Sequence, residues 1–417
     1  MKTVCTKDNC TGCMACVESC PKNAIKIVDE LDSYNAIINE EQCVNCDLCR
    51  KVCQNNRNVK FTQPIMWKQG WARDTLVWSS SSSGGVAQAI ERAFVRTGGI
   101  VCSCAFEKGT FGFMFAESEK EVEKFKGSKY VKSNPSGIYK KIKEYLIAGR
   151  KVLFVGLPCQ VEAVKCYVGE KLDNSLYTVD LICHGSPSPK VLDMFLAQYD
   201  IDTPKLSDIQ FRNKNNFAVR EGTSYIVQKG VLDKYSISFL NSISYTENCY
   251  HCQYANIMRV SDITLGDSWG SNLDIQEQRK GISLILNQTP KGKELLEQSE
   301  LELMDVELNR AIEHNHQLRH PSIKPNTREI FFGEIKNGKN FNAIVRKLYP
   351  KQSAKQLVKM FLIKAKIIGG GGYDKLWNKL CCEVNVSVIN LDSPMLFWVK
   401  DVDRNIGRIP RYNLLIS

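Results

Sequence analysis

The chain has 417 residues, of which 43% are hydrophobic and 24% charged, and its formal net charge is +11. This length is sufficient for two or three domains with buried cores, and no run of 18 apolar residues predicts a membrane-spanning helix. The basic surplus is local, because residues 339–379 hold ten Lys and Arg against one acid, whereas residues 1–60 hold eight of each. The charge therefore does not indicate a nucleic-acid-binding surface along the chain.

Eight cysteines near the N-terminus form the most specific motif, a C-x2-C-x2-C-x3-C pattern that occurs twice in the first 53 residues. In bacterial two-cluster ferredoxins, each repeat gives three thiolates to one [4Fe-4S] cluster and its fourth Cys to the other cluster. The first set of ligands would be Cys10, Cys13, Cys16 and Cys53. The second set would be Cys20, Cys43, Cys46 and Cys49. A zinc site would need only two C-x2-C steps, so we predict a protein that moves single electrons.

The flanking residues fit a ferredoxin-like domain over residues 1–60. Residues 24–28 and 36–38 predict two paired strands after the first cluster loop. Gln54 follows the last Cys of the second repeat, where the first repeat has Pro21, and this difference removes no ligand. The chain has 18 cysteines and a charged N-terminus unlike a secretion signal, which predicts the cytoplasm, where cysteines bind metal rather than form disulfides.

Residues 54–66 are polar and Asn-rich and predict a linker. Five serines and Gly84-Gly85 then precede an apolar-periodic stretch at 86–95, which predicts a loop entering a helix. Further along, short apolar runs alternate with helical patterns, which indicates an α/β core with added antiparallel strands. Strands are predicted at 100–106, 152–155, 177–183, 209–212, 224–227, 236–240, 263–266 and 282–286. Helices are predicted at 119–125 and 136–148, from 161 and from 190.

Four further cysteines stand out: Cys159 and Cys183 follow predicted strands, and Cys249 and Cys252 form a C-x2-C pair. Loops after neighbouring strands can converge at one edge of an α/β sheet. Two interpretations remain open: the four thiols hold a third [4Fe-4S] cluster, or they are small buried apolar side chains.

Two other loops are candidate contacts for a flavin cofactor. Ser83, Gly84 and Gly85 precede a helix, where unpaired backbone N–H groups favour an anion such as a pyrophosphate. Lys129 and Tyr130 offer a cation for a phosphate and a ring for an isoalloxazine. A helix cap and an ordinary surface turn are the alternatives at these two loops.

Six separated motifs carry a resemblance to a known family: SSSGGVAQAI, GSKYVKS, VLFVGLPCQVEAVK, VDLICHGSPSPKVLDMFL, CYHCQY and SDITLGDSWG. They resemble the beta-subunit family of coenzyme F420 hydrogenases and dehydrogenases, with a two-cluster ferredoxin domain fused at the N-terminus. The resemblance covers residues 1–335 and implies an FAD and iron–sulfur domain over residues 61–335. It also implies that Cys159, Cys183, Cys249 and Cys252 bind a third cluster. Leu157 departs from the family, which commonly has Thr at this position.

The resemblance implies an iron–sulfur flavoprotein oxidoreductase with two or three [4Fe-4S] clusters and FAD. Its donor or acceptor would be a deazaflavin, a ferredoxin or an unidentified metabolite, with a possible role in cell-surface polysaccharide metabolism. The alternative is a non-catalytic electron-transfer subunit that docks on a larger redox complex.

Residues 336–417 are predicted to form a basic, partly helical C-terminal segment. Between Lys351 and Ile368, Lys355, Lys359 and Lys366 share one helical face. The two interpretations are a helix packed on its own domain and a helix that docks on an anionic partner or membrane surface. No transmembrane segment is expected, although peripheral membrane contact is compatible with this charge.

Overall fold

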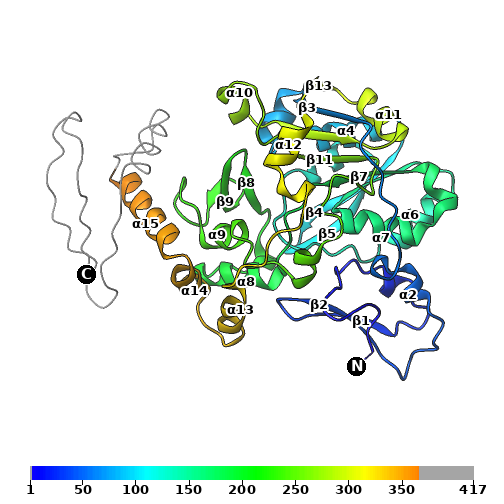
Figure 1. Cartoon of the computed structure of the whole chain (residues 1–417), viewed down its shortest axis with the longest axis horizontal. Coiled ribbons are helices and arrows are strands. Elements are labelled where there is room, and N and C mark those ends of the chain that lie inside the picture. The colour runs from blue at the N-terminus through cyan, green and yellow to red at the C-terminus, as the bar shows by residue number, and fades with distance from the viewer. Residues whose placement is uncertain (1, 366–417) are drawn as a thin grey trace. The chain divides into compact units, whose positions relative to one another are not determined.

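The computed structural model describes residues 2–365, and residues 1–354 form one compact unit (Figure 1). A second unit begins at Lys355. Within residues 2–365, no helix is long and apolar enough to cross a membrane. The predicted domain limits at residues 60 and 335 remain predictions.

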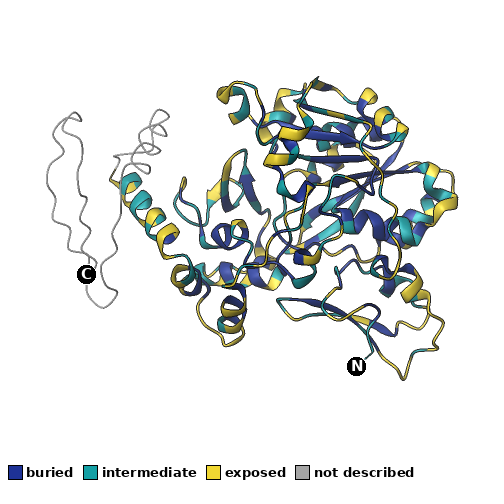
Figure 2. Ribbon diagram, in the orientation of Figure 1, coloured by how far each residue is buried: buried dark blue, intermediate teal, exposed yellow. Residues whose placement is uncertain are grey.

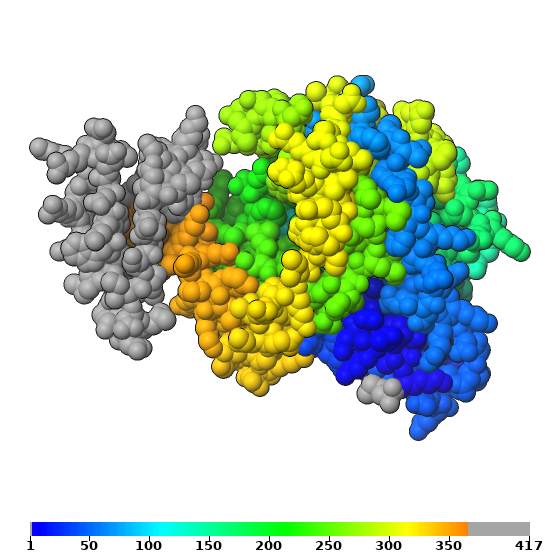
Figure 3. All heavy atoms as spheres, in the orientation of Figure 1, coloured from blue at the N-terminus to red at the C-terminus, as the bar shows by residue number. Residues whose placement is uncertain are grey.

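The N-terminal cysteine motifs lie on the loops of a small domain around the hairpin of β1 (Ile25–Asp29) and β2 (Tyr34–Ile38). Ile25 pairs with Ile38 and Asp29 with Tyr34, which confirms the two predicted strands. The domain also contains the short helices α1 (Ala15–Glu18), α2 (Leu48–Val52) and η1 (Gln54–Asn56). It is packed against the rest of the first unit rather than tethered to it (Figure 3).

An eight-stranded mixed sheet forms the centre of the α/β body. Its order is β13 (Leu301–Met304), β3 (Met66–Ala72), β12 (Ser283–Asn287), β11 (Ile263–Asp267), β7 (Leu176–Leu181), β6 (Val152–Gly156), β4 (Ile100–Glu107) and β5 (Thr110–Ala116). The four strands β11, β7, β6 and β4 are parallel, and antiparallel strands extend both sides. This arrangement confirms the predicted mixed α/β class. The sequence interpretation missed β3, which begins where the predicted linker ends.

Helices cover both faces of this sheet, and the strands between them are buried (Figures 1 and 2). On one face lie α4 (Val86–Arg96), α5 (Glu119–Val122) and α11 (Pro290–Gln298). On the other face lie α6 (Ile138–Ile147) and α7 (Pro158–Val168). The apolar core on this second face continues into the N-terminal domain, so the ferredoxin-like domain shares a core with α6 and α7.

A third core lies beside the sheet and joins four helices to a small antiparallel sheet. The helices are α8 (Pro189–Leu196), α9 (Lys234–Leu240), α13 (Arg328–Lys336) and α14 (Phe341–Leu348), and the strands are β8 (Gln210–Asn213), β9 (Asn216–Glu221) and β10 (Ser224–Tyr225). The remaining elements are α3 (Thr75–Ser80), η2 (Glu123–Phe125), η3 (Glu170–Ser175), η4 (Ala197–Tyr199), η5 (Thr203–Lys205), η6 (Glu247–His251), α10 (Ile275–Arg279), α12 (Leu308–His314), η7 (His316–Leu318) and α15 (Pro350–Lys364).

The prediction of a strand at 236–240 is wrong, because these residues belong to the helix α9. Alternating serines and apolar residues gave the period of a strand, but Ser236 and Ser238 are buried as well. The carboxylate of Asp233 accepts a hydrogen bond from the Ser236 backbone N at 2.6 Å and caps the helix.

The predicted basic helix is present as α15, and the described part ends at residue 365. Lys366 and the glycines at 369–372 lie outside the described residues. The preceding helix α14 buries Phe341, Ile344 and Val345 in the third core, so residues 341–348 belong to the first unit.

Candidate functional site

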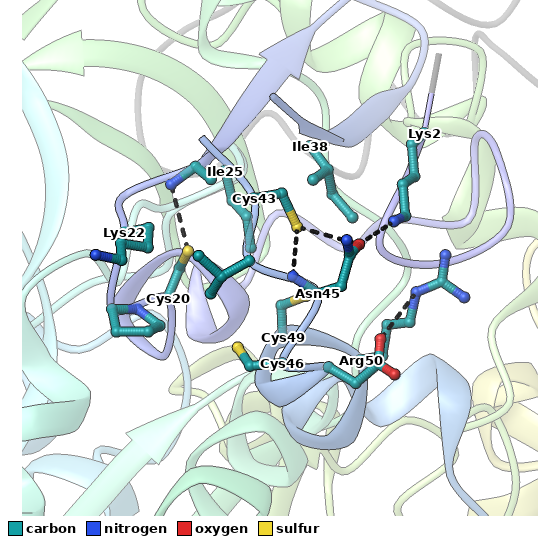
Figure 4. Close-up of a pocket in the computed structure, with 14 residues that line it drawn as sticks. Lys2, Cys20, Lys22, Ile25, Ile38, Cys43, Asn45, Cys46, Cys49 and Arg50 are labelled. Atoms are coloured by element: carbon teal, nitrogen blue, oxygen red, sulfur yellow. Dashed lines mark hydrogen bonds and ion pairs between the residues drawn. The ribbon is translucent and has the colours of Figure 1, made fainter. Parts of the chain in front are cut away.

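The second cysteine set lines one surface cavity of the N-terminal domain (Figure 4). Cys20 and Cys43 accept hydrogen bonds from the backbone N atoms of Ala24 and Asn45, at 3.3 and 3.4 Å. Such N–H···S contacts are typical of cluster ligands, because they stabilise thiolate charge. Cys46 is exposed, so this cavity opens to solvent. The other ligand candidate in the cavity is Cys49.

The first set, by contrast, is buried, and its four cysteines line a separate cavity. Its members are Cys10, Cys13, Cys16 and Cys53. Gly12 donates its backbone N–H to Cys10 Sγ at 3.4 Å and has φ +71°. A Cβ at Gly12 would meet the ring of Tyr34 at 2.5 Å, so this loop needs glycine both for its conformation and for space. Cys5 lines the same cavity as a fifth thiol.

The four further cysteines also converge. Cys159 is in the first turn of α7, Cys183 follows β7, and Cys249 and Cys252 lie on and after η6. Burial raises the pKa of Cys183 to about 12, and the nearby thiolates of Cys249 and Cys252 contribute to this increase. Burial also raises the pKa of Cys159, where the other three thiolates act in the same direction and Lys132 opposes them. The four thiols therefore share one environment, which we call the third set.

This convergence follows from the sheet topology. β6 and β7 are parallel neighbours, so the loops that carry Cys159 and Cys183 leave the same edge of the sheet. Arg259 joins the C-x2-C segment to this edge, because its guanidinium donates to Tyr254 O at 2.6 Å and to Leu181 O at 3.1 Å. Its ion-pair partner is Asp180 of β7, at 3.1 Å.

The three sets are neighbours in order. The first set belongs to the apolar core that the N-terminal domain shares with α6 and α7, and Cys20, Cys43 and Cys49 of the second set pack against this core. Cys159 and Cys252 of the third set pack against the same core, and Tyr139 of this core donates its hydroxyl hydrogen to the carbonyl of Cys13. Within residues 2–365, no three His, Cys, Asp or Glu side chains are placed to hold a single metal ion.

The predicted phosphate loop is tightly packed against the sheet. Ser83 Oγ donates to Ile282 O at 3.0 Å, and the Gly84 backbone N donates to Ser283 Oγ at 3.1 Å. A Cβ at Gly84 would lie 2.4 Å from Gly70 O, so the close approach that this glycine permits is to β3. Gly85 is the N-cap of α4 with φ +79°, and no side chain caps this helix. The first N–H groups of α4 are thus the part of the loop that suits an anion.

The two predicted flavin loops lie side by side, because the Ser128 backbone N donates to Ser82 Oγ at 2.9 Å. Lys129 Nζ donates to the carbonyls of Phe125 and Lys126, at 2.6 and 3.1 Å, and burial lowers the pKa of this amine. Lys129 therefore stabilises its own loop instead of projecting from it.

The Tyr130 ring stacks on Phe239 with centroids 4.3 Å apart, so in this conformation one face of the ring is covered. Its hydroxyl lies 3.4 Å from Arg212 Nη1. Arg212 also forms a bidentate ion pair with Asp267, at 2.6 and 2.7 Å, at the end of β11.

The sequence analysis missed the contribution of the β8–β9 hairpin. Lys214, in the turn of this hairpin, donates to the carbonyls of Trp78 and of Ser83, the latter at 2.7 Å. Burial and the nearby Arg212 lower the pKa of Lys214 to about 8. These cations come from a hairpin about 130 residues after the serine loop, and no local pattern marked them. Of Arg212, Lys214 and Asp267, only Asp267 lies in a motif that the sequence analysis singled out, SDITLGDSWG.

Comparisons with known proteins match two regions of the chain. Residues 9–56 match the family described as 4Fe-4S dicluster domain. Residues 149–308 match the family described as the C terminus of the coenzyme F420 hydrogenase/dehydrogenase beta subunit. No curated protein matches the chain.

Among solved structures, a chain of the F420-reducing [NiFe] hydrogenase complex from Methanosarcina barkeri is similar to this protein. The identity is 18% and the TM-score is 0.45, over 63% of this chain and 94% of that chain. The family matches confirm the resemblance noted from the motifs: the chain joins a region similar to the 4Fe-4S dicluster domain, at residues 9–56, to a region similar to the C terminus of the coenzyme F420 hydrogenase/dehydrogenase beta subunit, at residues 149–308.

Proposed function

We propose that the protein is an iron–sulfur flavoprotein oxidoreductase that holds three [4Fe-4S] clusters and FAD in a cytoplasmic redox reaction. The observation that carries this proposal is the order of the cysteine sets, from an exposed set to a buried set and then to a third set at the edge of the sheet. A bound flavin would exchange one electron at a time with clusters and two electrons with a substrate, which clusters alone do not do.

The chain's own residues have separable tasks in this proposal. Cys20, Cys43, Cys46 and Cys49 line the cavity that opens to solvent at Cys46 and would bind the cluster that a redox partner approaches. The buried first set is shielded from water, and Tyr139 of α6 holds its loop by donating to the carbonyl of Cys13. The next residues toward the flavin would be the N-terminal turn of α4 after Gly85 and the Lys129–Tyr130 loop.

Cofactor content tests the proposal. Protein purified without oxygen should contain about twelve irons per chain, four for each cysteine set, together with one FAD. Eight irons and no flavin would overturn it and leave a two-cluster electron carrier.

The predicted flavin loop has its own test, a comparison of Gly85→Asp with Gly85→Asn. Both variants are strained by about 1–2 kcal/mol at φ +79°, although Asn tolerates this conformation better than most residues. Only Asp places a negative charge beside the pyrophosphate, so we expect flavin loss in Gly85→Asp and retention in Gly85→Asn. Equal flavin content in both variants would place the pyrophosphate elsewhere.

The alternative function is a non-catalytic subunit that docks on a larger redox complex. The exposed apolar side chains of Val44 and Leu48 beside Cys46 favour contact with a protein partner. One assay distinguishes the two functions: it measures whether the isolated, pre-reduced chain reduces a free deazaflavin or another small acceptor. Turnover identifies the oxidoreductase, and reduction of protein partners alone identifies the docking subunit. A role in polysaccharide metabolism would follow only from the identity of that acceptor.

A further inference from the structure

Three buried side chains of the α/β body contact the loop that carries the first cysteine set. Lys132 Nζ donates to the carbonyl of Thr11 at 3.2 Å, and the Tyr139 hydroxyl donates to the carbonyl of Cys13. The Tyr254 hydroxyl donates to Oε1 of Gln54, whose Nε2 donates to Thr11 Oγ1 at 2.9 Å. Lys132, Tyr139 and Tyr254 are 6%, 0% and 3% exposed.

The same side chains border the third set. Tyr254 follows Cys252 by two residues, and it belongs to the apolar core against which Cys159 and Cys252 pack. The backbone N of Lys132 donates to the carbonyl of Pro187, four residues after Cys183, at 2.8 Å, and Oγ of the next residue, Ser133, accepts from Nε2 of Gln160, which follows Cys159, at 2.9 Å. Lys132 therefore lies between the two cysteine sets.

Lys132 differs from most buried cations of this protein in its partners. Arg259 pairs with Asp180, and Arg212 pairs with Asp267. Among the described residues, no carboxylate forms an ion pair with Lys132, whose contacts are the carbonyl of Thr11 and the ring of Tyr34, 5.2 Å from Nζ to centroid. A buried ammonium without a negative partner is costly, so its charge is expected to be balanced by another group at this position.

We propose that Lys132 is the shared counter-charge of the first cluster and of the cluster at the third set, and that it raises the reduction potentials of both. This inference rests on the proposed third cluster. A [4Fe-4S] cube with four thiolates is negative, and each added electron makes it more negative. A fixed positive charge in a low-dielectric core stabilises the reduced form most strongly, which makes the potential more positive.

The test is a redox titration of the full-length, anaerobically purified protein, followed by EPR, for the wild type and for Lys132→Met. We expect the midpoint potentials of the first and third clusters to shift to lower values in the variant. The potential of the second cluster should stay unchanged, because Lys132 does not adjoin that set. Lys132→Arg should restore values close to those of the wild type, which loss of packing alone would not explain.

Lys190→Met is the matched control. Lys190 also reaches from the α/β body to the N-terminal domain, where its Nζ donates to the carbonyl of Asp29 at 2.9 Å. It therefore makes the same type of interdomain contact as Lys132, away from the cysteine sets. Its removal should leave all three potentials unchanged.

The outcomes separate this inference from the proposed function. If the wild type holds about eight irons, the third cluster is absent, and the proposed function and the shared role of Lys132 both fail. If about twelve irons are present and Lys132→Met leaves both potentials unchanged at full iron content, only the inference fails. Lys132→Gln removes the charge but keeps a donor for Thr11 O, and it gives the same test if Lys132→Met does not fold.

Discussion

Arg259 offers a quantitative prediction about how the third set is held. Its side chain is 2% exposed and donates to Tyr254 O, Leu181 O and Thr264 Oγ1, as well as to Asp180 Oδ1. The change Arg259→Met keeps the apolar volume but leaves the fully buried carboxylate of Asp180 without its counter-charge. Breaking a buried pair in this way costs about 3–5 kcal/mol. The two loops that carry Cys183 and Cys252 also lose their connection, so the third set should bind less iron.

The assay is urea unfolding of the full-length protein together with its iron content. Arg259→Met should lower the free energy of unfolding by about 3–5 kcal/mol. The double variant Asp180→Asn/Arg259→Met should recover part of this loss, because no uncompensated charge remains. Arg96→Met is the control, since Arg96 is 44% exposed in its side chain and its pairs with Glu119 and Glu300 are expected to contribute less than about 1 kcal/mol. The reasoning is refuted if Arg259→Met costs no more than Arg96→Met.

Four further predictions follow from individual sites. Glu91 is buried, and burial raises its pKa to about 8. The folded state therefore favours the neutral carboxyl. The resulting contribution to folding stability is complete below the unfolded pKa and is lost as pH rises from about 4.5 to 8. Glu91→Gln should remove that pH dependence, which amounts to at most about 5 kcal/mol in stability measurements across this range. Gly84→Ala should destabilise the protein by about 1–3 kcal/mol, because the added Cβ would lie 2.4 Å from Gly70 O. The control is Gly333→Ala in α13, where the added Cβ would have no heavy atom within 4 Å, so this change should be neutral or stabilising. Cys13→Ala should remove about four irons and destabilise the N-terminal domain in the same unfolding assay; full iron content would contradict the ligand assignment. Deleting residues 355–417 leaves α14 in its core. The truncated protein should co-sediment less with anionic vesicles and bind less to an acidic ferredoxin, and both losses should be larger at low salt. Equal binding by the truncated and full-length proteins would exclude a docking role for this segment.

The sequence predicted the features that depend on residues close to one another along the chain. The spacing of the eight N-terminal cysteines defined two ligand sets, and the structure places the members of each set around one cavity. Short apolar runs predicted the parallel strands because these strands are buried on both faces. The third set required a resemblance, because its cysteines are up to 93 residues apart and only the order of the strands brings them together.

Other features depended on tertiary contacts that no local pattern encodes. The alternation at 236–240 indicated a strand, but burial on all sides of α9 produced the same pattern. Gln54 was noted only as a departure from Pro21, whereas its amide connects Thr11 to Tyr254. Proline has no side-chain amide that could make this connection. No local pattern distinguishes Lys132 from the other lysines, because its burial and its lack of an ion-pair partner among the described residues depend on tertiary contacts.

The central claim is that the third set lies between the N-terminal clusters and the flavin. The most direct measurement is rapid mixing of the wild type and of Cys249→Ser with a one-electron reductant under anaerobic conditions, while cluster and flavin absorption are followed separately. The account predicts that both proteins reduce their N-terminal clusters at the same rate and that the flavin of the variant is reduced much more slowly. Flavin reduction at the same rate in both proteins, each with a full flavin content, would contradict it.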